Sequence, residues 1–195
     1  MKLTRALPIL AAVLLLTATL IARSVKHSAA FLSMDRKVEI LEANAQRPPS
    51  QPQNTDLTQP ELNAYIAEGG LDLPKGIESA KFELTPAVIH TTATVNFDTI
   101  SEGHTGNNPI FSALFTGVHD VEAQAQASGA HGQGTIAVDW VKLDGVQIPR
   151  SALEYLLQHY VKPKYPDAGM TTTFALPLRI DMAVVTSGKV TLTQK

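Results

Sequence analysis

An uncharged, mostly apolar run near the N-terminus constrains this chain more than any other feature of its sequence. The run extends from Ala6 to Ala22, between Arg5 and Arg23. Its 17 residues would form about 25 Å of helix, at the short end for crossing a hydrocarbon core of about 30 Å. Leu3 and the apolar stems of the two arginines can extend it. We therefore predict that residues 1–26 form a single transmembrane segment.

Two fates of this segment are open, since a cleaved signal peptide also has a basic start and an apolar centre. Cleavage requires small residues just after the apolar run. Leu20-Ile21-Ala22 begins with a large side chain, and Ser28-Ala29-Ala30 lies several residues further on. We therefore favour an uncleaved signal anchor. The positive charges before the run favour a cytoplasmic N-terminus and an extracytoplasmic C-terminal domain.

The chain after the anchor divides into three parts. Residues 27–46 are predicted to form a juxtamembrane helix, because their apolar residues recur at spacings of three and four: Phe31, Met34, Val38 and Leu41. Residues 47–56 contain three prolines and are predicted to be a stiff linker. Residues 57–195 are predicted to be one extracytoplasmic domain, which is long enough to bury a core of its own.

The domain reads as α+β, with a curved antiparallel sheet that packs on one or two helices. Thr58 and Glu61 have the spacing of a capping box and predict a helix start, and Ser151 and Glu154 predict a second one. Apolar and polar residues alternate in the predicted strands between the helices. A short helix or turn is expected at 110–115, and Asp144-Gly145 is expected to form a tight turn. A proline-marked loop over 164–173 and two further strands follow the second helix. The strand ranges are 80–84, 92–98, 121–128 and 135–143, then 178–186 and 189–194.

The sequence contains no motif that indicates an enzyme, a cofactor or a metal. The net charge is -2, so there is no basic excess to suggest a nucleic-acid partner, and there is no cysteine. The six histidines lack metal-ligand spacing, and no G-x-S-x-G is present. The glycine-rich stretch 129–134 joins two strands, so it predicts a hairpin and not a phosphate loop. We predict a non-catalytic protein without a cofactor and without a nucleic-acid partner.

The apolar face of the 121–128 strand is more informative because its side chains are small. We expect it to form one wall of a groove, and the apolar face of the second helix to form the other. A groove of this kind suits an acyl chain or another apolar ligand. Close packing of the domain's own helix is the alternative reading of the small residues. The predicted ligand-binding residues are Val121, Ala123, Ala125, Ala127, Leu153, Leu156, Leu157 and Tyr160.

Four short segments resemble a known family when they are taken in order. They are 61–66 (ELNAYI) in the first helix, 73–77 (LPKGI) before a strand, 143–149 (LDGVQIP) before the second helix, and 174–178 (FALPL) before the last hairpin. In this order the chain resembles small bacterial envelope proteins of the tubular lipid-binding (TULIP-like) type. The resemblance covers about residues 57–195. It implies a curved sheet around a helix and binding of a lipid or another apolar ligand in the cell envelope, and it supplies no catalytic residues.

These observations lead to one expectation and one alternative. We expect a single-pass protein of the bacterial inner membrane whose C-terminal domain lies in the periplasm or extracytoplasmic space. Its partners would be the lipid bilayer and a lipid or other apolar ligand held between sheet and helix. The alternative is an accessory or assembly subunit of a membrane protein complex.

Overall fold

A computed structural model describes residues 27–47, 51–100, 116–163 and 166–195 of the chain. The predicted anchor at 1–26 lies outside the described residues, and so does the short helix or turn expected near 110–115. Among the helices within the described ranges, none combines the length and the apolar character that crossing a membrane requires.

The described elements are strands in groups of one to three, separated by helices. The first half contains α1 (Ala29–Gln46), β1 (Gln53–Thr58), α2 (Gln59–Ala67), β2 (Ile77–Thr85), β3 (Val88–Asn96) and α3 (Phe97–Ile100). The second half contains β4 (Val118–Ala130), β5 (Gln133–Leu143), β6 (Val146–Gln147), α5 (Arg150–Leu156), the π-helical turn η2 (Leu157–Val161), β7 (Thr171–Ala175), β8 (Ile180–Thr186) and β9 (Lys189–Gln194).

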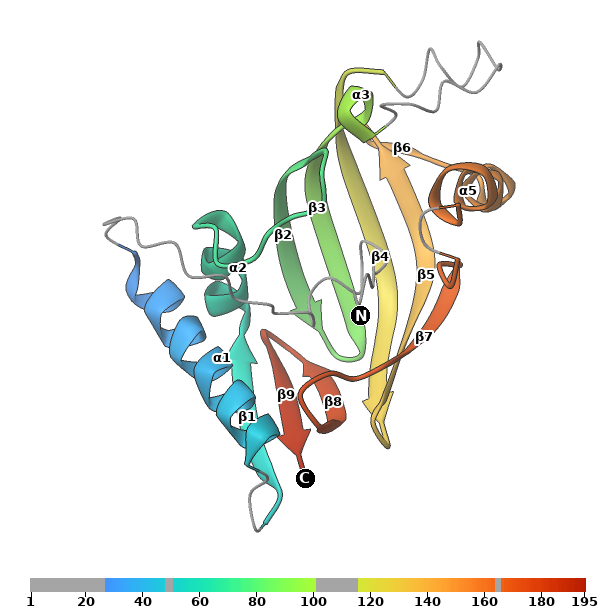
Figure 1. Cartoon of the computed structure of the whole chain (residues 1–195). Helices are drawn as coiled ribbons and strands as arrows, with labels where there is room; N and C mark the ends of the chain where they lie inside the picture. Colours follow the sequence, from blue (N-terminus) through green and yellow to red (C-terminus); the bar gives the residue numbers. More distant parts are fainter. Residues whose placement is uncertain (1–26, 48–50, 101–115, 164–165) are drawn as a thin grey trace.

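The nine strands form one antiparallel sheet, which confirms the predicted α+β class. Strands β1, β9 and β8 form a small wing; β2, β3, β4 and β5 form a large wing, with β6 and β7 on the outer edge of β5. The wings meet where Gly129 pairs with Ala183. A Cβ atom on Gly129 would lie 2.9 Å from that of Ala183, so the close junction needs a glycine. Figure 1 shows the two wings side by side.

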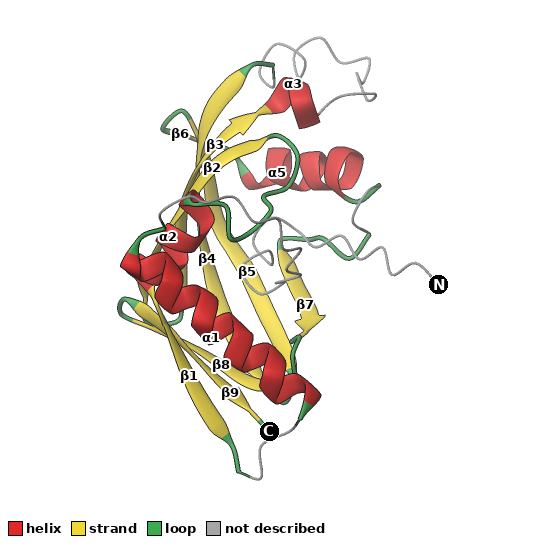
Figure 2. Ribbon diagram, turned by 60° about the vertical axis from the view of Figure 1, so that its left-hand side comes forward, coloured by secondary structure: helices red, strands yellow, loops and turns green. Residues whose placement is uncertain are grey.

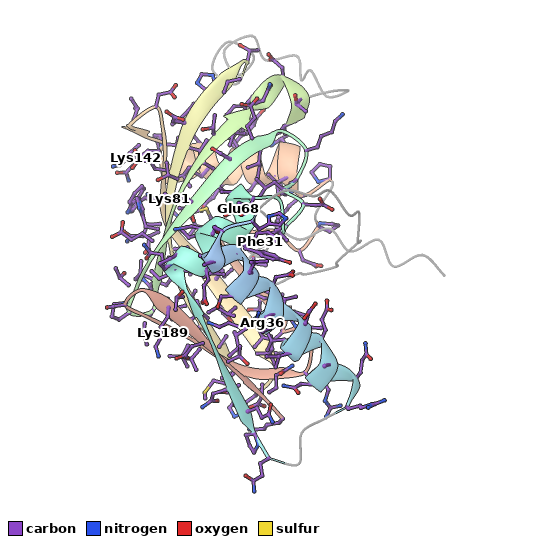
Figure 3. The ribbon with its side chains drawn as sticks, turned by 90° about the vertical axis from the view of Figure 1, so that its left-hand side faces the viewer. Phe31, Arg36, Glu68, Lys81, Lys142 and Lys189 are labelled. Atoms are coloured by element: carbon purple, nitrogen blue, oxygen red, sulfur yellow. The ribbon has the colours of Figure 1, made fainter. Side chains whose placement is uncertain are left out.

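The two faces of the sheet differ in chemistry. Helices α1, α2 and α5 lie on one side of it, which we call the inner face (Figure 2). Lys81, Lys142 and Lys189 lie on the opposite, outer face (Figure 3). Along β4, Ala123 and Ala125 are buried while Gln124 and Gln126 are not. The predicted alternation of this strand is therefore confirmed.

Trp140 does not lie where the alternation of its strand predicts. The sequence places Trp140 on one side with Ile136 and Val138. In the structure the β4–β5 pairing slips by one residue at Asp139, so Trp140 pairs with Gln124 of the outer face. A β-bulge inserts one residue and reverses every later side chain, which the period-two pattern cannot show.

Helix α1 is part of the domain core. Its bounds match the predicted helix, but its buried residues join the same apolar cluster as α2 and the strands: Phe31, Met34, Val38 and Leu41. This differs from the expected juxtamembrane segment set apart by a linker. Residues 53–56 of that expected linker form most of β1. The outward side chains of this strand are polar and form hydrogen bonds with side chains of β9. Asn54, for example, accepts a hydrogen bond from the Thr193 hydroxyl at 2.7 Å.

Candidate functional site

The small residues of β4 lie on the inner face, where the sequence predicted them. Ala125 is completely buried, and Ala123 is 7% exposed. Val121 packs in a cluster at one end of the large wing with Ala93 and Val95. Ala127 packs at the other end, against the main core and beside Ala125. The stripe thus runs along the inner face of β4, between the two ends of the large wing.

The predicted second wall of the groove comes from α5 and η2. Leu153 is buried, whereas Leu156 and Leu157 are half-buried. The side chain of Tyr160 lies outside the description. Helix α5 stands on the inner side of the sheet (Figure 2). The apolar clusters that hold the stripe contain none of these residues among those described, so a groove between the two walls stays a prediction.

The start of α5 also differs from the predicted capping box. The helix begins at Arg150 after Pro149, without a side-chain cap. Glu154 pairs instead with Arg150, Oε1 to Nε at 3.0 Å. Proline fits here because its fixed φ suits the start of a helix and it has no N–H to satisfy.

A small cavity of about 40 Å³ lies between the two wings, and its lining is apolar almost throughout. Ala127 is the member of the predicted stripe that reaches it. The sequence did not predict the other lining residues as part of a site; most come from strands, and Leu62 comes from helix α2. They are Leu57, Leu62, Ile89, Ser128, Gly134, Thr135, Ile136, Phe174, Leu176, Val185, Val190 and Leu192.

Phe174 and Leu176 reach the cavity through strand β7 and the residue after it. The sequence predicted a proline-marked loop over 164–173, a range that includes the first three residues of this short strand. In the structure β7 pairs with β5, and Phe174 lies opposite Gly134. The run of threonines before Phe174 was the available signal, since β-branched residues favour strands.

Within the part of the chain that the structure describes, Thr91 places an unpaired polar group on the inner face. Thr91 is 7% exposed, and its hydroxyl oxygen is buried without a hydrogen bond. It lies opposite Ala123 in the β3–β4 ladder. Burying an unpaired hydroxyl costs about 1–3 kcal/mol. The group is available to hydrogen-bond an oxygen that enters between sheet and helices.

A partly buried ionic contact joins α1 to α2. Lys37 Nζ is 2.7 Å from Glu61 Oε2, and the Thr58 N–H donates to the same oxygen at 2.8 Å. The second bond belongs to the predicted capping box, which is therefore confirmed. Burial opposes ionisation of Glu61, but hydrogen bonds from Lys37, Ser33 and Thr58 outweigh it and lower its pKa to about 2. This group ties α1, β1 and α2 together.

A second charged pair lies at the far end of the large wing. His119 Nδ1 is 2.6 Å from Asp144 Oδ2, and His119 Nε2 is 2.8 Å from the Thr116 carbonyl. Asp144 and Gly145 form the predicted tight turn, both with positive φ. Hydrogen bonds to Asp144 and Thr116 raise the pKa of His119. The contacts of His119 hold the start of β4 in place. Thr116 lies just before this strand, and Asp144 belongs to the turn that follows β5.

Within the described ranges, no group of three or more histidine, aspartate or glutamate side chains could hold a metal ion. Along the described part of the β4 stripe, the inner face offers apolar contact and, at Thr91, a hydroxyl without a hydrogen-bond partner. Comparisons with protein-family models, with curated proteins and with solved structures gave no match.

Proposed function

We propose that the chain is a membrane-anchored, non-catalytic envelope protein that binds a lipid or another apolar ligand between its sheet and its helices. The observation that carries the proposal is the apolar cavity between the wings, which the small side chain of Ala127 borders. Apolar cavities do not hold water well and accept apolar guests. Ala127 joins this cavity to the small-residue stripe of β4.

The size of the cavity limits what it holds. A cavity of roughly 150 Å³ binds benzene, whereas this one measures about 40 Å³. It takes the tip of an acyl chain, and the rest of the chain extends along the inner face past Ala125 toward Thr91. The Thr91 hydroxyl would then donate to an ester or carboxyl oxygen of the ligand. The curved sheet with helices on one face supports the tubular lipid-binding resemblance (Figure 2).

Native mass spectrometry of the full chain, extracted in detergent, tests the proposal. We expect lipid to co-purify with the wild type and to be lost from Ala127→Leu, which fills the cavity. Ala137→Leu is the matched control, because Ala137 lies on the outer face of β5 opposite Gln126. Circular dichroism checks that both variants fold. A wild type without lipid, or lipid retained by Ala127→Leu, would contradict the proposal.

An accessory subunit of a membrane complex is the second candidate, and exposed apolar side chains favour it. Met182 and Val184 are 41% and 42% exposed on the outer face of β8. They lie among threonines of β9 and could contact a partner protein. A lipid-free chain that migrates with a larger membrane complex, and leaves it on Val184→Asp, would support this candidate instead.

A further inference from the structure

Helix α1 has an exposed side that the core does not use. Its large apolar residues Leu32 and Ile40 are 50% and 46% exposed. Positions four and eight apart lie on one side of a helix, so Arg36 stands between them. The exposed residues that form this strip, which we call the outer stripe of α1, are Leu32, Arg36, Glu39, Ile40, Ala43 and Arg47.

The start of α1 is fixed to the fold, and it follows the apolar run by only a few residues in the sequence. Ser28 caps the helix, and its backbone N–H donates to Glu68 Oε2 at 2.8 Å. The ring of His27 stacks on Phe31 with centroids 3.9 Å apart. The apolar run ends at Ala22, and the six residues 23–28 span at most about 21 Å. An anchored chain therefore holds α1 near the membrane surface.

We propose that the outer stripe of α1 lies on the surface of the bilayer, with Leu32 and Ile40 at the boundary between headgroups and acyl chains. This inference rests on the membrane anchoring in the proposed function. Leucine and isoleucine interleaved with arginine are typical of interfacial helices. Arg36 and Arg47 bond to lipid phosphates, and two guanidinium groups against the single carboxylate of Glu39 favour anionic lipids.

The bilayer fits the stripe better than a partner protein does. The tether makes contact with the membrane intramolecular, so even a weak surface affinity is sufficient. The helix has 18 residues and is about 27 Å long, which lets both apolar residues meet the same surface. The other exposed apolar pair, Met182 and Val184, lies on the outer face of the sheet among threonines and so provides a comparison.

The absence of cysteine from the chain permits a direct test with single spin labels. Leu32→Cys, Ile40→Cys and the control Val184→Cys are labelled in the full chain. The chain is reconstituted in phosphatidylcholine vesicles with a minority of phosphatidylglycerol. Electron paramagnetic resonance measures accessibility to oxygen and to a water-soluble nickel chelate. We expect the oxygen-to-nickel ratio at 32 and 40 to be several-fold higher than at 184.

The outcomes separate this inference from the proposed function. Alkaline carbonate washing reports whether the chain is anchored, independently of the labels. An anchored chain whose labels at 32 and 40 are as water-accessible as the label at 184 would overturn the inference alone. Spin–spin broadening between copies would assign the stripe to self-association and also overturn it. Arg36→Gln and vesicles without phosphatidylglycerol should each lower the ratio at Leu32→Cys and Ile40→Cys.

Discussion

Lys37 of α1 places its ammonium nitrogen 2.7 Å from each carboxylate oxygen of Glu61 on α2. The same ammonium group donates to the backbone carbonyl of Asp56 on β1 at 2.7 Å. Lys37 therefore links three elements that follow one another in the chain. Because Glu61 is buried, removal of Lys37 would leave a buried carboxylate without its cation, so the link is costly to break.

Acid should weaken this link, and Glu61→Gln should remove it. The pKa of Glu61 falls from 4.5 to about 2 on folding, so the unfolded chain binds more protons between these values. Its contribution to stability is complete above pH 4.5 and is lost as the pH falls toward 2. At about 1.4 kcal/mol per pKa unit, Glu61→Gln should lower the free energy of unfolding by about 3 kcal/mol at neutral pH.

Urea unfolding at several pH values measures this effect. The difference between wild type and Glu61→Gln should shrink as the pH approaches 2. Glu154→Gln is the control, because its pair with Arg150 is exposed and should contribute less than about 0.5 kcal/mol. A difference that does not change with pH would show that Glu61 acts through packing and not through its charge.

His119 should bind its proton more tightly because of Asp144. Both ring nitrogens of His119 face acceptors, so the doubly protonated ring satisfies both contacts. Since the pKa is raised on folding, the stabilisation is complete below pH 6.5 and is lost as the pH rises through the folded-state pKa. Nuclear magnetic resonance titration should show a lower pKa for His119 in Asp144→Asn.

Asp139→Asn is the matched control for this titration. Asp139 is also a carboxylate on the large wing, but it accepts hydrogen bonds from Gln124 and Gln126 and not from histidine. Its replacement should leave the His119 curve in place. Equal shifts in the two variants would mean that general charge, and not the contact with Asp144, sets the pKa.

Replacement of Gly134 by a larger residue should destabilise the fold, even though Gly134 lies in a regular strand. A Cβ atom there would lie 2.7 Å from Phe174 Cζ, which is closer than real contacts allow. Gly134→Ala should therefore lower the free energy of unfolding by about 1–3 kcal/mol in thermal or urea melts. Phe174→Leu in the same chain should restore part of that loss, and strictly additive effects would contradict the proposed clash.

The sequence predicts local features of this fold well and their partners poorly. The capping box of Thr58 and Glu61 and the hairpin turn at Asp144 involve neighbours in sequence, so spacing alone identifies them. Lys37, by contrast, reaches Glu61 across 24 positions, and no local pattern indicates this contact. The bulge at Asp139 shows the same limit, because a single inserted residue moves Trp140 to the other face.

The candidate site divides in the same way. Alternation in β4 places Ala123 and Ala125 on the buried face, which a period of two reveals directly. The cavity, however, forms where the two wings meet, and residues such as Leu57 and Phe174 come together there through strand order. Strand order depends on pairings between distant segments, which one sequence does not display. The stripe could be predicted, but its neighbours across the cavity could not.

Gln194 should be essential for holding α1 against the sheet, although it is residue 194 of 195. It is 1% exposed, and its amide nitrogen donates to the carbonyls of Leu41 and Leu178 at 2.9 and 2.6 Å. Its oxygen accepts from Asn44 at 3.0 Å. Gln194→Leu leaves these buried groups unpaired and should lower the free energy of unfolding by about 2–3 kcal/mol.

The position of the loss identifies its cause. Because Leu41 and Asn44 belong to the last turns of α1, hydrogen exchange in Gln194→Leu should rise there before it rises in β4. Gln46→Leu, at an exposed position of the same helix, should change neither exchange nor stability by more than about 0.5 kcal/mol. Uniform acceleration across the sheet in Gln194→Leu would mean that Gln194 supports the whole core. Acceleration confined to α1 would show that it holds the helix in place from the far end of the chain.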